Sequence, residues 1–146
     1  MDTIQLEVKF ETLPEATEPE LTIEIAINKE VLGPDFSVDI LALHNAAQQS
    51  GEHFIWTCAC GIPECGGIYH GVRVSHDQDA VVWLVPKVPL KQAVQFEFDK
   101  VAYVSTVMNA LREYIRYFKS YSAAGIAFEA AHSWQLNELL TMMAKS

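Results

Sequence analysis

Apolar and polar residues alternate along two segments near the start of the chain, residues 4–10 and 21–27. A period of two is typical of a strand that buries one face. The acidic segment between them, residues 13–20, contains two prolines and suits a long turn. The pattern therefore predicts an antiparallel hairpin.

Several later segments also carry the apolar, aromatic and β-branched residues that favour strands. One of them contains residues 81–85, which are continuously apolar, so we expect it to be central in the sheet and covered on both faces. Asp77, Gln78 and Asp79 form the turn before it. The expected strands are residues 53–57, 68–76, 80–85 and 94–98.

Helical spacing appears in three places. We expect one helix to begin at an N-cap on Ser37 and to end before Gly51. The longest begins at Asp99, and a third begins at Ser133. The stripe of the longest helix comprises Val101, Val104, Met108, Leu111, Ile115 and Phe118. The sequence thus predicts an α+β fold, a mostly antiparallel sheet of about five to six strands with two to three helices packed on it.

Length and charge restrict the class of protein. The 146 residues fit a single domain over 1–146. The net charge of -9 disfavours nucleic acid and anionic membranes as partners. It leaves open an acidic inhibitor of the immunity-protein kind that binds a basic partner, or a charge that only keeps the chain soluble. The absence of a long apolar run or a signal-peptide pattern leads us to expect a cytosolic protein.

The main chemical feature is a cysteine-rich turn at residues 58–67. Cys58, Cys60 and Cys65 are the three cysteines of the chain. An odd number of clustered cysteines argues against a disulfide framework. Glycines and a proline between them allow the thiolates to converge, as zinc requires. The sequence therefore predicts a zinc site on these cysteines.

A closed structural zinc site needs a fourth ligand. His70, five residues after Cys65, is the first choice, and His53 and His76 are the competitors. With water in the fourth position the site would suit an enzyme instead. The leading hypothesis is a binding or structural module in which zinc fixes the turn.

Two other interpretations of the thiols remain. They can be unligated and packed as small apolar groups in a reducing compartment. They can also be redox-active, with a strained disulfide between Cys58 and Cys60 that Cys65 resolves.

The same region resembles a known group of proteins. The segment from Trp56 to Gly67, with Cys58-x-Cys60-Gly61 and Cys65-Gly66-Gly67, followed by a valine-rich stretch ending at Trp83, is similar to small uncharacterised bacterial proteins with a Cys-x-Cys-Gly-x3-Cys-x-Gly signature. The resemblance covers roughly residues 54–118. It implies a shared fold and a bacterial cytosolic protein, and it implies no activity and no fourth ligand.

The C-terminal segment is unusually apolar. In a helix from Ser133, Leu136 points away from Leu139 and Leu140 because successive residues turn by about 100°. A helix that is apolar on two sides is normally sandwiched between other elements. We therefore expect either a homodimer, in which a second copy covers this helix, or a monomer whose last segment wraps the sheet.

Overall fold

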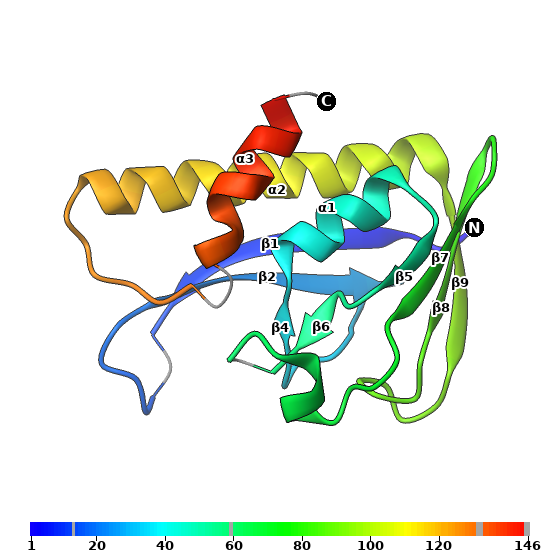
Figure 1. Cartoon of the computed structure of the whole chain (residues 1–146), viewed down its shortest axis with the longest axis horizontal. Helices are drawn as coiled ribbons and strands as arrows, with labels where there is room; N and C mark the ends of the chain where they lie inside the picture. Colours follow the sequence, from blue (N-terminus) through cyan, green and yellow to red (C-terminus); the bar gives the residue numbers. More distant parts are fainter. Residues whose placement is uncertain (13, 59, 131–132, 145–146) are drawn as a thin grey trace.

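The computed structural model describes residues 1–12, 14–58, 60–130 and 133–144. Within this part the predicted α+β class is confirmed, with three α-helices and nine strands. All the paired strands are antiparallel, and they form three sheets instead of one. In Figure 1 the helices lie together on one side of the molecule, and the strands lie beneath and beside them.

The predicted N-terminal hairpin is confirmed. Strands β1 (Ile4–Glu11) and β2 (Glu20–Ile27) pair from Ile4 opposite Ile27 to Glu11 opposite Glu20. The short strand β3 (Glu30–Val31) extends this sheet. Every second residue of β2 is buried, so the hairpin turns one face to the core and leaves the other polar.

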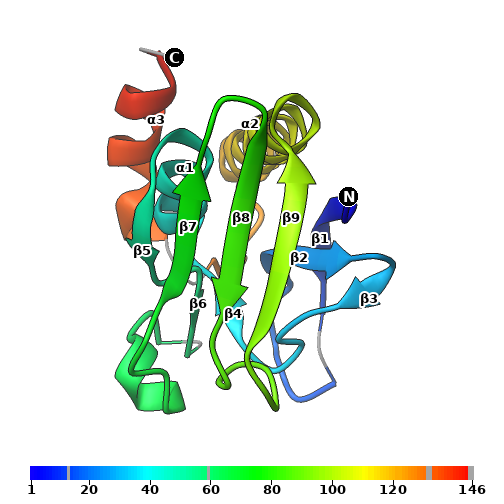
Figure 2. The same ribbon diagram turned by 90° about the vertical axis from the view of Figure 1, so that its right-hand side faces the viewer.

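A second sheet has the order β5-β7-β8-β9. Its members are β5 (Gly51–His53), β7 (Val72–His76), β8 (Ala80–Val85) and β9 (Val94–Asp99). Strand β8 is internal, as predicted, but Leu84 is 42% exposed. The expected coverage of both faces is therefore wrong at Leu84, because only the face that carries Trp83 meets the core. Figure 2 shows this sheet in front of the helices, with β1 and β2 running crosswise behind it.

A third, very small sheet changes the start of the first helix. Strand β4 (Ser37–Val38) pairs with β6 (Trp56–Thr57). Ser37 lies in β4, three residues before Ile40, the first residue of the helix, so the expected N-cap on Ser37 is wrong. Helix α1 (Ile40–Gln48) is capped by Asp39, whose Oδ1 accepts hydrogen bonds of 3.0 Å from the N–H groups of Leu41 and Ala42.

The longest helix, α2 (Lys100–Ala123), begins at the expected cap, because Asp99 accepts a hydrogen bond from the Ala102 N–H. Met108, Leu111 and Ile115 of the expected stripe are buried, as predicted, and the buried face extends to one side of that stripe. Tyr103 and Tyr114 are buried, whereas Val101 is 80% exposed. Two tyrosines therefore share the buried face of α2 with aliphatic side chains that the sequence predicted.

Buried hydrogen bonds connect α2 with the sheet and with α1. The indole Nε1 of Trp83 donates to the Tyr103 hydroxyl at 3.1 Å, and that hydroxyl donates to the Ala46 carbonyl at 2.8 Å. The His76 Nε2 also lies 2.9 Å from the Ala46 carbonyl oxygen. The last carbonyls of a helix lack intrahelical partners, so Tyr103 and His76 satisfy one of those of α1.

Helix α3 (Leu136–Ala144) follows a short 3₁₀ turn, η2 (Ser133–Gln135), and packs beside α1. Leu136 and Leu139 both belong to the core, whereas Trp134 is 71% exposed. One chain therefore covers both leucines, and the homodimer remains a prediction. The expected cap on Ser133 concerns a side chain outside the described part. No described helix is long and apolar enough to span a bilayer.

Candidate metal centre

The cysteine-rich turn begins where β6 ends. The Gly61 N–H donates to the Cys58 carbonyl at 2.8 Å, which closes a tight turn around Cys60. Gly61 has a φ of 87°, a left-handed conformation that glycine adopts without steric cost. The Thr57 hydroxyl also donates to the Cys58 carbonyl, at 2.9 Å. These bonds turn the chain back immediately after the strand.

Cys65 returns on a second short element, the 3₁₀ helix η1 (Pro63–Gly66). Gly67, with a φ of 82°, ends the helix, and its N–H donates to the Glu64 carbonyl at 3.0 Å. A Cβ on Gly66 would lie 3.1 Å from the Phe36 ring and 3.6 Å from the Cys58 Cβ. The absence of a side chain at Gly66 therefore lets η1 pack closely against the Phe36 ring, next to Cys58.

The two turns bring all three thiols together. The sulfur atoms of Cys58, Cys60 and Cys65 lie within 4.8 Å of one another. Zinc binds thiolates at about 2.3 Å, so its sulfur ligands are about 3.8 Å apart in a tetrahedral site. A contraction of about 1 Å or less would bring these sulfurs to that spacing. The three residues fit a thiophilic metal ion, and sulfur ligands favour zinc, copper(I) or iron–sulfur chemistry.

The thiols influence one another electrostatically. Hydrogen bonds with the Cys60 and Cys58 thiols, and the charges that these groups carry, raise the pKa of Cys65 to about 11. Without a cation the cluster therefore disfavours three thiolates side by side. A bound metal ion would supply the positive charge that allows all three to deprotonate.

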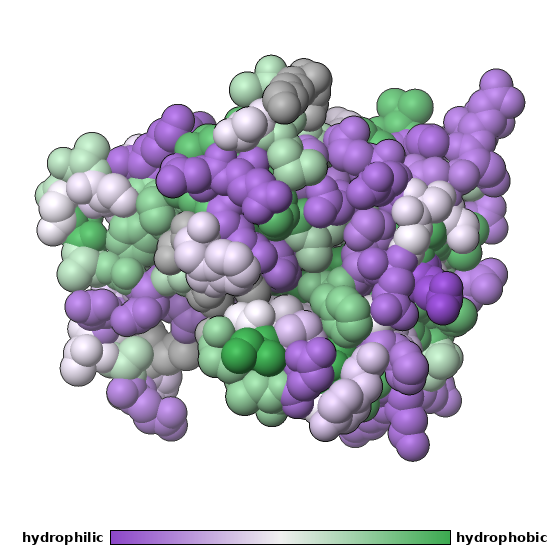
Figure 3. Space-filling view, in the orientation of Figure 1, coloured by the Kyte–Doolittle hydropathy of each residue, from purple (hydrophilic) through white to green (hydrophobic). Residues whose placement is uncertain are grey.

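The cluster lies at the surface. Cys60 and Cys65 are exposed, and Cys58 is partly buried. The neighbouring side chains Ile62 and Tyr69 are 55% and 70% exposed. In the view of Figure 3, apolar side chains gather below the centre of the molecule, over the segment that contains the turn. Small reagents can therefore reach the thiols directly.

The histidines are less favourably placed than the cysteines for binding a metal ion at this site. His70 is exposed and lies between η1 and β7. Among the described residues, the ligand atoms that lie within 4.8 Å of one another are the three cysteine sulfurs, and His70 does not belong to this group. The competitors His53 and His76 already contact the carbonyl oxygens of Gln49 and Ala46, at 3.1 and 2.9 Å. His70 as the fourth ligand remains a prediction.

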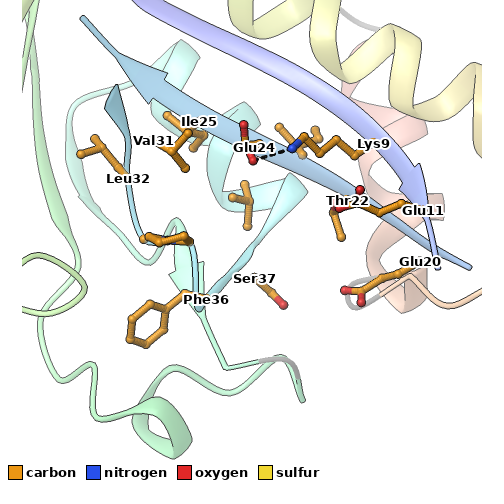
Figure 4. A pocket seen from close by; sticks show the side chains of 14 residues that line it. Lys9, Glu11, Glu20, Thr22, Glu24, Ile25, Val31, Leu32, Phe36 and Ser37 are labelled. Atoms are coloured by element: carbon orange, nitrogen blue, oxygen red, sulfur yellow. Dashed lines mark ion pairs between the residues drawn. The ribbon is translucent and has the colours of Figure 1, made fainter. Parts of the chain in front are cut away.

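A second feature, which the sequence analysis missed, lies on the polar face of the N-terminal hairpin. A recess of about 160 Å³ lies between this face and the segment of residues 31–38. Figure 4 shows Lys9, Glu11, Glu20 and Glu24 around it. Lys9 forms an ion pair of 2.8 Å with Glu24. The regular placement of glutamates along both strands is the signal that could have revealed it.

The glutamates of this face oppose one another in the β-ladder. Glu7 lies opposite Glu24, and Glu11 lies opposite Glu20. Like charges directly opposite on paired strands destabilise a sheet. Lys9 is surrounded by these groups, and its hydrogen bond with Glu24 raises the pKa of its ammonium group. The hairpin therefore presents a negative surface.

The chain matches no family model, no curated protein and no solved structure. The fold and the thiol cluster are therefore the basis for the functional proposal.

Proposed function

We propose that this protein is a zinc-binding module in which Cys58, Cys60 and Cys65 hold the ion. The observation that carries the proposal is the convergence of three thiols, from two separate turns, to within 4.8 Å. Clustered thiolates strongly favour zinc over hard cations such as magnesium. His70 supplies the fourth ligand by a movement of the exposed segment before β7.

In this proposal zinc has a structural role. The ion joins the end of β6, which pairs with β4 and buries Trp56, to the surface element η1. Zinc binding is coupled to folding wherever the ligands are brought together only in the folded chain. The ion therefore stabilises the turn and orients the exposed side chains of Ile62 and Tyr69 beside it.

The fourth ligand is tested by substitution. We expect His70→Ala to lower zinc retention during dialysis against a chelator by at least tenfold, because the site loses one of its ligands. His76→Ala serves as the matched control, since the His76 ring contacts the Ala46 carbonyl and lies outside the proposed site. Equal retention in both variants would transfer the fourth position to His53 or to water, and the latter favours an enzyme.

A second function is favoured by the negative face of the hairpin. We propose that the four glutamates of this face, two from each strand, bind a basic segment of a protein partner, as an acidic inhibitor would. Lys9 already offsets part of the repulsion between Glu7 and Glu24 through its ion pair with Glu24, so the like-charge repulsion is greatest between Glu11 and Glu20. A partner with lysine or arginine side chains relieves that repulsion and gains attraction at long range.

A short oligo-arginine peptide is a suitable probe for this surface. We expect its binding to weaken as salt increases and to weaken in a Glu11→Gln, Glu20→Gln double variant. A Glu138→Gln variant on α3 provides a control with a smaller change in charge away from the hairpin. Binding that is equal in both variants would contradict a role for the hairpin face.

A further inference from the structure

The thiol cluster has a property that zinc binding alone does not require, namely the exposure of two of its three sulfurs. Cys60 and Cys65 are exposed, whereas Cys58 is partly buried, beside Gly66. A structural zinc site needs only convergent ligands. Exposure allows a small oxidant to reach the first two sulfurs before the third.

Resting on the proposed zinc site, we propose that Cys60 and Cys65 form a reversible disulfide in response to a peroxide, and that this reaction releases the metal ion. Their sulfurs lie no more than 4.8 Å apart, and a disulfide requires about 2.05 Å. The connecting residues form a tight turn and a single 3₁₀ turn with glycines at both ends. A movement of about 3 Å is within reach of such a segment at the surface.

The chemistry balances with a peroxide as the named oxidant. The thiolate of one exposed cysteine attacks the O–O bond of hydrogen peroxide, which gives a sulfenic acid and hydroxide. The second thiolate then attacks the sulfenic sulfur, the S–S bond forms and a second hydroxide leaves. Two thiolates are oxidised by two electrons in total, and both peroxide oxygens are reduced to hydroxide.

Metal release follows from the ligand count. A disulfide sulfur carries no negative charge and is a poor ligand, so the site keeps only Cys58 of its three thiolates. One thiolate, even with His70, does not satisfy the four-ligand requirement of zinc. Reduction by a dithiol restores both thiolates and hence the site.

Ring size and exposure favour a disulfide between Cys60 and Cys65 over the disulfide between Cys58 and Cys60 that was considered from the sequence. A disulfide between Cys58 and Cys60 encloses a single intervening residue, and such a small ring strains the disulfide geometry. Cys58 is also the least exposed of the three. We therefore assign Cys58 as the cysteine that remains a thiol.

The test treats zinc-loaded and chelator-treated protein with hydrogen peroxide and follows released zinc, thiol count and peptide masses. We expect each chain to lose two thiols and about one zinc ion, with the disulfide mapped to Cys60 and Cys65 and reversed by dithiothreitol. Cys58→Ser should still form the disulfide, whereas Cys60→Ser and Cys65→Ser should not.

Further results separate this inference from the proposed function. Zinc that stays bound with all three thiols intact after peroxide, or a disulfide that includes Cys58, overturns the inference and leaves the zinc site standing. A protein that takes up no zinc but forms the Cys60–Cys65 disulfide overturns the proposed function and the metal release that rests on it, and it leaves the disulfide standing. Irreversible sulfinic acid without a disulfide also contradicts the inference.

Discussion

The buried hydroxyl of Tyr103 serves three parts of the fold at once. It accepts from the Trp83 indole of the sheet and donates to the Ala46 carbonyl at the end of α1. We expect Tyr103→Phe to lower the free energy of unfolding by about 1–3 kcal/mol, because it leaves a buried donor unpaired. Urea unfolding measures the change.

Tyr117→Phe is the matched control, since Tyr117 lies on the same helix and is only partly buried. We expect its free energy of unfolding to stay within about 0.5 kcal/mol of the original. Equal losses in both variants would show that the buried hydroxyl contributes nothing specific.

His44 is a second residue with a distinct effect on stability. It is 2% exposed, and its ring nitrogens have no hydrogen-bond partner in the described part of the chain. Burial lowers its pKa below the usual 6.5. The unfolded chain therefore binds a proton more readily than the folded chain does. The stabilisation that comes with neutral His44 is complete above pH 6.5, and it is lost as the pH falls through the folded-state pKa.

We expect His44→Leu to reduce this acid sensitivity. Urea unfolding at about pH 7.5 and about pH 5.5 should show a smaller difference in stability for the variant than for the original chain. An unchanged difference would mean that groups other than His44 account for the acid dependence.

At the scale of elements, Gly33 shows how a single position fixes the path between β3 and β4. Its φ is 57°, and an added Cβ would lie 2.8 Å from the Trp56 ring. We expect Gly33→Ala to cost roughly 2–4 kcal/mol through backbone strain and overpacking together. Thermal unfolding followed by near-ultraviolet circular dichroism reports on both the stability and the packing of Trp56.

Gly125 provides the comparison. Its φ is 72°, but nothing lies within 4 Å of an added Cβ. Gly125→Ala should therefore cost only the strain of the left-handed conformation, about 1–2 kcal/mol. A loss as large as that of Gly33→Ala would show that the Trp56 contact is unimportant.

The elements differ in how well the sequence predicts them. The hairpin and α2 were predictable because each has a long periodic pattern, and β8 was predictable because it contains a continuous apolar run. The pairing of β4 with β6 was not, since each strand has two residues and too few positions to show a period. That pairing makes Ser37 extended and moves the cap of α1 to Asp39.

The candidate site divides in the same way. Spacing and glycine content predicted the convergence of Cys58, Cys60 and Cys65, because tight turns are a local property. The position of His70 depends on how the chain leaves η1 and enters β7, and residues 68–70 belong to no strand. Local pattern does not determine that path.

The recess beside the polar face of the N-terminal hairpin depends on the register between β1 and β2. That register follows only once the hairpin is paired.

On the scale of the whole molecule, helices α1, α2 and α3 and the two larger sheets enclose one core. The thiol cluster lies outside that core, at the surface. We therefore expect metal removal to loosen the turn without unfolding the chain. Far-ultraviolet circular dichroism should be nearly unchanged after chelation, while hydrogen exchange accelerates around residues 60–67. Global unfolding on chelation would contradict this separation.

The measurement that tests the account most directly is the zinc content of freshly purified, untagged protein, determined beside its count of reactive thiols. We predict about one zinc per chain with three protected thiols, and loss of the zinc in Cys60→Ser. Three freely reactive thiols with no metal, even after zinc is supplied to the reduced protein, would contradict the central claim.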